Sequence, residues 1–199
     1  MNIEKQYRDK AVVYAENEKA WAQWLAENGG TVEGVWLVIF KKGSQVSSVI
    51  YPEAVDTALC YGWIDSLPNK RDAQSYYQYF APRNPKSNWS KVNKEKIKRL
   101  EKEGRLAPPG IAMIKLAKES GTWDALNDVD NLVVPIDLEE AMQQYSSARK
   151  NWDAFPPSTR RGILEWIFNA KRPATRAKRI AETAALAQKN ERANQFKRK

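Results

Sequence analysis

The sequence predicts an α+β fold that is mainly helical, with a small N-terminal sheet and a C-terminal helical module. The run GVWLVIF at Gly34–Phe40 is short, nearly all apolar and rich in β-branched residues, which is typical of a central strand. Apolar residues on either side recur at helical spacing, and the last third of the chain has a helical pattern throughout. Together these patterns indicate a small mixed or antiparallel sheet followed by helices.

The length and composition allow one domain with a helical extension. Of the 199 residues, 42% are hydrophobic, which is enough to form a buried core. We expect an α+β domain at 1–125 and a helical module at 133–199 that packs on the first domain as one unit. The stretch 122–136 is a longer connection between predicted helices and is the predicted boundary.

Capping chemistry marks the helices of the first 62 residues, after a polar segment at 1–12 where we expect no regular structure. Asparagine is a preferred N-cap, glycine a common stop and proline a favoured first residue of a helix. The marks are the N-cap Asn17, the stop Gly29–Gly30, the first-turn Pro52 and the stop Gly62.

The strands that complete the predicted sheet follow Gly62. Trp63–Asp65 is predicted to continue as a strand, and Leu67–Pro68–Asn69 has the composition of a turn. The segments 70–73 and 75–81 are predicted to be further strands.

Each later helix has a starting residue chosen from cap or proline chemistry. These starts are Ser90 or Asn93, Pro108–Pro109, Asp137 with Glu140 as a capping box, Ser147, Ser158 and Pro173. Helical spacing predicts three inward-facing sets: Ile111, Ile114 and Ala117; Ala148, Trp152 and Phe155; and Ala177, Ile180, Ala181 and Ala184. Residues 189–199 form a polar basic tail.

Aromatic and charged residues gather between 51 and 93 and suggest the wall of a ligand site. A guanidinium matches phosphate or carboxylate, an ammonium adds charge, hydroxyls add hydrogen bonds and an indole adds a stacking face. The predicted ligand-binding residues are Trp63, Asp65, Tyr79, Arg83, Lys86, Ser87 and Trp89. The structural alternative is that Asp65 pairs with Arg83 and that the tryptophans belong to the core.

Two further features favour a phosphate-rich partner, each with a structural alternative. On the helix that Pro173 begins, Arg172, Arg176 and Arg179 share one side and form a basic face that could bind nucleic acid. The tyrosines at 76–79 could stack bases if they lie on a sheet. A solvated helix face and a half-exposed sheet explain the same residues and are favoured.

Several kinds of catalytic or metal site are excluded by composition. Histidine is absent, which removes the commonest general base and metal ligand. The single cysteine, Cys60, lies in an apolar helical run and is expected to be buried rather than reactive. We find no nucleotide-binding or zinc-protease motif, so we expect no cofactor, no metal and no catalytic residue. Asp65 with Lys86 is the one acid–base pair to consider.

Three segments resemble the YdeI/OmpD-associated family, also called bacteriocin-protection proteins. They are GVWLVIFKKGS with YPEAVDTALCYGWIDS, then YFAPRNPKSNWSKVNKEKIKRLEKEGR, then FPPSTRRGILEWIFNAKRPATRAKRIAET. The resemblance covers roughly residues 20–187. It implies a role in tolerating bacteriocins or cationic antimicrobial peptides, through a porin, and it implies no reaction or cofactor.

The sequence therefore predicts a cytoplasmic accessory protein of bacterial stress or peptide tolerance that binds an anionic small molecule or protein partner. No export signal is visible and no apolar run approaches a membrane span, which argues against contact with a porin. The formal charge of +9 would repel cationic peptides. The alternatives are a nucleic-acid-binding protein that uses the basic C-terminal helix and tail, and an enzyme for small acidic or phosphorylated substrates with Asp65 as acid or base.

Overall fold

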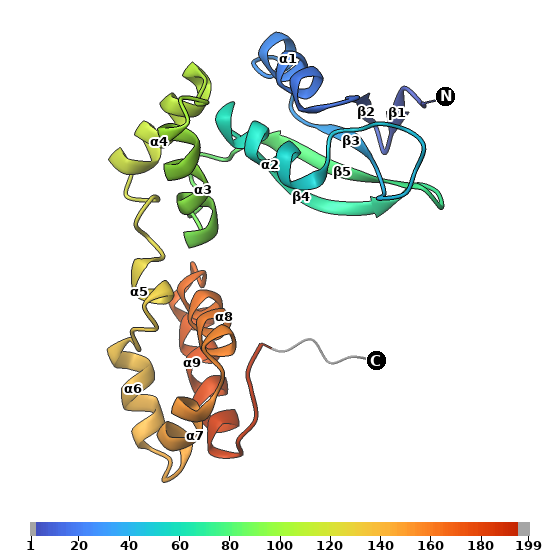
Figure 1. The fold of residues 1–199 in the computed structure, drawn as a ribbon. Coiled ribbons are helices and arrows are strands. Elements are labelled where there is room, and N and C mark those ends of the chain that lie inside the picture. The colour runs from blue at the N-terminus through green and yellow to red at the C-terminus, as the bar shows by residue number, and fades with distance from the viewer. Residues whose placement is uncertain (1–2, 195–199) are drawn as a thin grey trace. The chain divides into compact units, whose positions relative to one another are not determined.

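Five strands form one mixed sheet in the computed structural model, which describes residues 3–194 (Figure 1). The strands are β1 (Gln6–Tyr7), β2 (Lys10–Tyr14), β3 (Val35–Phe40), β4 (Trp63–Lys70) and β5 (Ser75–Pro82). Their order is β1-β2-β3-β5-β4, and only the β2–β3 pair is parallel. The α+β class, the helical majority and the position of the sheet near the N-terminus are confirmed.

The prediction that residues 1–12 lack regular structure is wrong for the part of that segment that the structure describes. Arg8 and Asp9, both with positive φ, form the turn between β1 and β2. Strand β2 then pairs with the apolar β3 from Ala11↔Val35 to Tyr14↔Val38. The prediction grouped the start of β2 with the polar residues before it and overlooked the short apolar run at 11–13, whose pairing partner is distant in the sequence.

The turn predicted at Leu67–Pro68–Asn69 lies inside β4 instead. The β4–β5 register shifts between Asp65 and Pro68, and β4 is an edge strand, which is where a proline without an N–H donor is tolerated. The reversal falls at 71–74, part of the predicted strand 70–73. There the Asp72 carboxylate accepts hydrogen bonds from the backbone of Gln74 and Ser75 at 2.8 and 2.7 Å.

Four helices accompany the sheet in the N-terminal unit, which spans Met1–Asp124. They are α1 (Glu18–Asn28), α2 (Tyr51–Cys60), α3 (Lys91–Lys102) and α4 (Pro108–Glu119). The predicted caps Asn17 and Ser90 accept from the backbone N–H of Ala20 and Asn93. Helix α3 ends before Gly104, whose φ of 69° suits glycine.

The two faces of the sheet bury different side chains. Helices α1 and α2 cover one face, where Trp21, Leu37 and Leu59 belong to the main core (Figure 1). Trp36, Val38 and Tyr77 form a smaller cluster on the other face. In α4, Ile114 and Ala117 are buried as predicted, but Ile111 is 53% exposed, because only one stripe of the helix meets the core.

The C-terminal unit, Ala125–Lys199, is helical within its described part. Its helices are α5 (Asn127–Asp130), α6 (Ile136–Gln143), α7 (Ala148–Ala154), α8 (Pro157–Phe168) and α9 (Pro173–Gln188). They enclose a separate core around Leu138, Trp152 and Ile163. The predicted connection 122–136 contains α5.

Several predicted caps and buried positions of this unit are wrong. Pro135 and Pro156 are the N-caps of α6 and α8, so neither the Asp137–Glu140 box nor Ser158 has that role. On α9, Ile180 and Ala184 are buried as predicted, whereas Ala177 and Ala181 are exposed. The buried stripe of α9 runs instead through Ile180, Thr183, Ala184 and Ala187.

None of the helices in the described part of the chain is long and apolar enough to cross a membrane.

Candidate functional site

Three of the predicted ligand-binding residues are part of the packed interior. Trp63 and Trp89 are each 2% exposed and Arg83 is 5% exposed. The Trp63 indole donates to the carbonyl of Gly29 at 3.2 Å. The Arg83 guanidinium lies 3.9 Å from the Trp89 ring centroid and donates to the carbonyl of Asn88. The structure therefore brings Arg83 and Trp89 together, but as a buried stack.

Arg83 is an uncommon interior group because it is a cation without a carboxylate beside it among residues 3–194. Its Nε has no hydrogen-bond partner, and burial lowers the pKa of the guanidinium to about 10. Its contacts with Asn88 and Trp89 fix the loop that precedes α3. This geometry explains Arg83 as a packing residue of that loop.

The other members of the predicted set lie apart from this stack. Asp65 accepts a hydrogen bond from the Tyr51 hydroxyl at 2.7 Å, so the predicted alternative of an Asp65–Arg83 pair is not formed either. Burial and this carboxylate raise the pKa of Tyr51 to about 12. Lys86 is exposed, and the Ser87 hydroxyl donates to the carbonyl of Asn84.

Tyr79 is separated from Asp65 by the sheet itself. Asp65 pairs with Phe80, a residue of the main core, whereas Tyr79 packs 4.9 Å from Trp36 in the cluster on the opposite face. The predicted ligand-binding residues are therefore close in the sequence but do not line one common site. A ligand-binding role for the seven residues stays a prediction.

Two of the three arginines of the predicted basic face are held by the protein itself. Arg176 forms two hydrogen bonds with Asp137, at 2.7 and 3.0 Å. Arg179 donates to the carbonyl of Trp166 and lies 4.8 Å from its ring centroid. Arg172 is exposed at the start of α9. These contacts leave Arg172 as the most available cation of the three.

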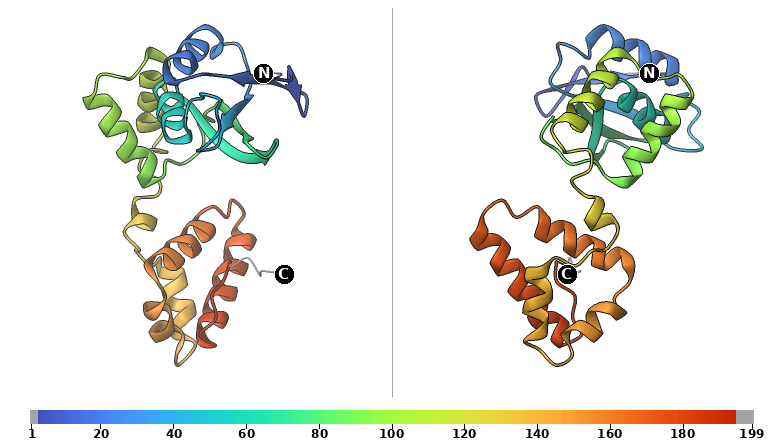
Figure 2. Two further views of the ribbon diagram at one scale, coloured as in Figure 1. Left: turned by 45° about the vertical axis from the view of Figure 1, so that its right-hand side comes forward. Right: turned by 90° about the vertical axis from the view of Figure 1, so that its left-hand side faces the viewer.

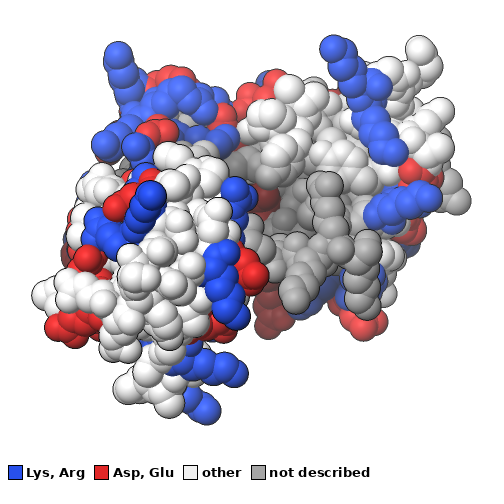
Figure 3. Space-filling model, turned by 90° about the horizontal axis from the view of Figure 1, so that it is seen from below, with Lys and Arg blue, Asp and Glu red and all other residues white. Residues whose placement is uncertain are grey.

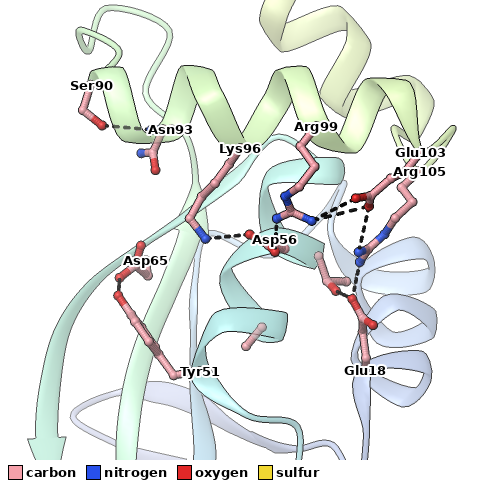
Figure 4. A network of polar contacts seen from close by, with 12 residues as sticks. Glu18, Tyr51, Asp56, Asp65, Ser90, Asn93, Lys96, Arg99, Glu103 and Arg105 are labelled. Atoms are coloured by element: carbon pink, nitrogen blue, oxygen red, sulfur yellow. Dashed lines mark hydrogen bonds and ion pairs between the residues drawn. The ribbon is translucent and has the colours of Figure 1, made fainter.

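Sequence analysis missed a polar network that joins three helices of the N-terminal unit (Figure 4). Asp56 on the buried side of α2 is 9% exposed and accepts hydrogen bonds from Lys96, at 2.6 Å, and Arg99 of α3. Burial acts to raise the pKa of Asp56, but the two cations outweigh it, so that the pKa lies below its ordinary value. The available signal was an acid in the apolar helical run of α2.

The network continues from Asp56 to α1. Arg99 also contacts Glu103 at 3.2 Å, and Arg105 bridges Glu103 and Glu18 (Figure 4). The Thr57 hydroxyl donates to the same Glu18 carboxylate at 2.8 Å. Charges of both signs alternate along this path, so that α1, α2 and α3 are connected with little net charge.

Two hollows of the N-terminal unit lie beside this network and share Tyr61. One has a volume of 290 Å³ and carries charged side chains of both signs; its lining includes Glu18, Lys19, Thr57, Cys60 and Arg105. The other has a volume of 410 Å³ and is mainly apolar; its lining includes Leu25, Ala26, Ala107, Pro108 and Pro109. Cys60 is 2% exposed, and burial raises the pKa of its thiol to about 11.

A groove of 350 Å³ lies between α6 and α9, which run side by side (Figure 2). We call it the α6/α9 groove. Its lining consists of Asp137, Ala141, Gln144, Tyr145, Pro173, Arg176, Ala177, Ile180, Ala181 and Ala184. The Asp137–Arg176 pair is its main charged feature. The remaining lining is largely apolar and includes Ala177 and Ala181, the two residues that were expected in the core.

Within residues 3–194, no three or more Cys, Asp or Glu side chains are arranged to hold a metal ion.

Residues 131–190, which contain α6 to α9, match the family described as bacteriocin-protection, YdeI or OmpD-associated. This match lies within the C-terminal unit, and we call residues 131–190 the YdeI/OmpD-associated domain. Residues 13–113, just over half of the chain, match a different family, a domain of unknown function (DUF8412), and the chain belongs to that family. No curated protein and no solved structure matches the chain.

The match confirms the resemblance seen in the sequence over the YdeI/OmpD-associated domain and assigns the first half to a second family. The α6/α9 groove lies entirely inside the YdeI/OmpD-associated domain. The groove is thus an open surface in the part of the chain that matches a family described by bacteriocin protection.

Proposed function

We propose that the chain is an accessory protein of bacteriocin tolerance that acts by binding, and that the α6/α9 groove receives an amphipathic helix of an acidic protein partner. The observation that carries the proposal is the groove itself, an open apolar surface within the matched domain. Amphipathic helices commonly bind by laying an apolar face into such a groove.

The dimensions of the groove suit a helix. Its α9 wall extends from Pro173 to Ala184, about 16 Å along the helix axis or roughly three turns. Ala177 and Ala181 are exposed on this wall, and their small side chains let a partner backbone approach closely. Tyr145, 38% exposed, offers an aromatic contact of the kind that often dominates binding energy.

The charge of the chain favours an acidic partner over a cationic peptide. The formal net charge is +9, and Lys171, Arg172 and Lys178 are exposed on or just before α9. Acidic residues beside the apolar face of a partner helix would be attracted to these cations, whereas a basic peptide would be repelled.

The carboxylates support binding rather than acid–base catalysis. The pKa values of Asp56 and Asp137 both lie below the ordinary value. For Asp137 the hydrogen bond from Arg176 is the main cause, and for Asp56 the cations of α3 outweigh burial. Carboxyls held ionised by cations are poor proton donors at neutral pH. The raised pKa values of Cys60 and Tyr51 likewise keep these groups protonated.

Binding of nucleic acid is the weaker alternative, because the basic side chains are dispersed over the surface and some of them already contact other groups of the protein. Arg176 and Arg179 have internal partners. On the face shown in Figure 3, the groups of Lys and Arg are interrupted by acidic and uncharged residues.

The test uses two designed helical peptides with the same apolar stripe, one with acidic and one with basic flanks. Fluorescence anisotropy with the full chain measures the affinity of each. We expect the acidic peptide to bind at least about tenfold more tightly than the basic one, since charge complementarity separates them. Ala181→Trp, which fills the groove, should weaken the acidic peptide about tenfold or more, because it removes a desolvated central contact.

Ala174→Trp is the matched control, because Ala174 is an exposed alanine of α9 outside the groove lining. It should bind the acidic peptide like the unmodified chain. Equal binding by the two tryptophan variants, a preference for the basic peptide, or no binding of either peptide would overturn the proposal.

A further inference from the structure

We infer that the N-terminal unit contains a second and separate site, which binds a free α-amino acid with an apolar side chain. The site consists of the two hollows that meet at Tyr61, which we call the Tyr61 site. One hollow presents charges of both signs, and the other presents aliphatic and proline surface. A zwitterion that carries an apolar side chain is the ligand that complements both.

The polar hollow can hold an ammonium and a carboxylate together. Thr57 and Arg105 both donate to Oε1 of Glu18, and neither contacts Oε2, which leaves an acceptor for an ammonium group. Arg105 and the exposed Lys19 supply the cations for a carboxylate. The side chains of Glu18 and Arg105 are 37% and 33% exposed, so a ligand can reach both without unfolding the helices.

The two hollows have one lining residue in common. Tyr61 lines both, and Leu25, Pro108 and Pro109 continue the apolar wall. Volumes of 410 and 290 Å³ are of the size that small-molecule sites occupy, about 300–1,000 Å³. A ligand that fills both hollows would bind its charged groups near Glu18 and extend its side chain past Tyr61 toward Pro108.

The walls of the Tyr61 site are fixed by close backbone contacts. The N–H of Ala107 donates to the carbonyl of Cys60 at 3.1 Å. A Cβ at Gly110 would lie 2.1 Å from that same carbonyl oxygen, so only glycine lets the start of α4 approach the end of α2 this closely. The Pro108–Pro109 wall is therefore held in place before any ligand arrives, which lowers the entropy cost of binding.

Cys60 provides a chemical readout of the site, in which labelling is slow because the thiol is buried and its pKa is raised. It is the single cysteine of the chain and lines the polar hollow. A small methanethiosulfonate reagent must enter that hollow to reach the thiol, so a bound amino acid should slow the labelling.

The experiment measures binding of L-leucine to the full chain by calorimetry, with the rate of Cys60 labelling as a second readout. Leucinamide lacks the carboxylate, and 4-methylpentanoate lacks the ammonium. We expect each analogue to bind at least about tenfold more weakly than L-leucine, because each loses one charged contact. L-Leucine should slow the labelling, and the analogues should do so less at the same concentration.

Variants on the exposed side of α1 provide the structural control. Ala26→Trp fills the apolar hollow and should abolish both binding and protection. Gln23→Trp is on the same helix, exposed and outside both linings, and should bind like the unmodified chain. Ala181→Trp in the other unit should also leave L-leucine binding intact, which separates this site from the α6/α9 groove.

Three results would overturn the inference. The first is equal binding of L-leucine and its two analogues. The second is equal binding by Ala26→Trp and Gln23→Trp. The third is no binding or protection by leucine, isoleucine, methionine or phenylalanine up to about 10 mM. A dissociation constant above that concentration corresponds to a binding free energy weaker than roughly 3 kcal/mol.

Discussion

Asp56 of the N-terminal unit is held between two cations of a neighbouring helix, whereas Asp137 of the C-terminal unit forms a more exposed pair with Arg176 at an open groove. Both carboxylates are ionised and both face arginine. Asp56 connects elements of the fold, while the Asp137 pair borders a surface that stays open among the described residues of its own unit. Paired charges alone therefore do not distinguish a structural network from a binding surface; what lies beside the pair does.

The largest difference between the two carboxylates should be in stability. Asp56→Ala leaves Lys96 and Arg99 without their shared acceptor, and we expect it to lower the free energy of unfolding by about 2 kcal/mol. This is less than for a fully buried pair, because Arg99 is nearly half exposed and regains water. Urea unfolding followed by circular dichroism measures the change. Glu103→Ala, at an exposed position of the same network, is the control and should cost about 0.5 kcal/mol or less.

The dependence of stability on pH should also report on this network, because Asp56 loses its charge in acid. A carboxyl whose pKa is lower in the folded than in the unfolded state stabilises the fold above its unfolded-state pKa, about 3.9 for Asp. That contribution is lost as the pH falls through the folded-state pKa. The pKa of Asp56 is lowered in the fold, so we expect Asp56→Asn to reduce the loss of stability between neutral pH and pH values below about 4. An unchanged pH dependence would contradict the assignment.

A smaller effect is expected for Asp137→Ala. Its side chain is nearly half exposed and that of Arg176 a third exposed, so solvent screens the pair and the cost should be about 0.5 kcal/mol. The same urea experiment measures it. A loss as large as that of Asp56→Ala would show that the groove is closed and stabilised by this pair, and would remove the contrast between the two units.

A comparably small effect is expected for Arg83→Met. Among the residues that the structure describes, this buried guanidinium makes one hydrogen bond and faces no carboxylate, so an apolar side chain of similar length should change the stability by less than about 1 kcal/mol. Thermal unfolding checks this, with Arg83→Ala as the comparison that also removes packing on Trp89. A strong loss in Arg83→Met but not in Arg83→Lys would show that the charge has a role that the geometry does not explain.

Local chemistry was enough to predict much of the fold. The apolar run that became β3, the caps Asn17 and Ser90, and the first-turn prolines of α2, α4 and α9 could all be found in the sequence, because each depends on neighbouring residues. Strands β1 and β2 could not, because β2 depends on pairing with β3 about 25 residues away.

The sites were harder to predict, because they depend on the direction in which side chains point and on contacts between residues that are distant in the sequence. Tyr79 and Asp65 are close in the sequence but lie on opposite faces of the sheet. Ala177 and Ala181 have the spacing of core residues, but the buried stripe of α9 passes beside them and leaves them exposed in a groove. The Asp56 network joins residues about 40 positions apart, which no local pattern reveals.

The most direct test maps the acidic amphipathic peptide onto the full chain by nuclear magnetic resonance, using the backbone amide signals. We expect the shifts that change on titration to cluster at Asp137, Tyr145, Ala177 and Ala181, and to be lost in Ala181→Trp but not in Ala174→Trp. Changes centred instead on Trp63, Arg83 and Trp89 would contradict this account and return the binding site to the segment that the sequence first suggested.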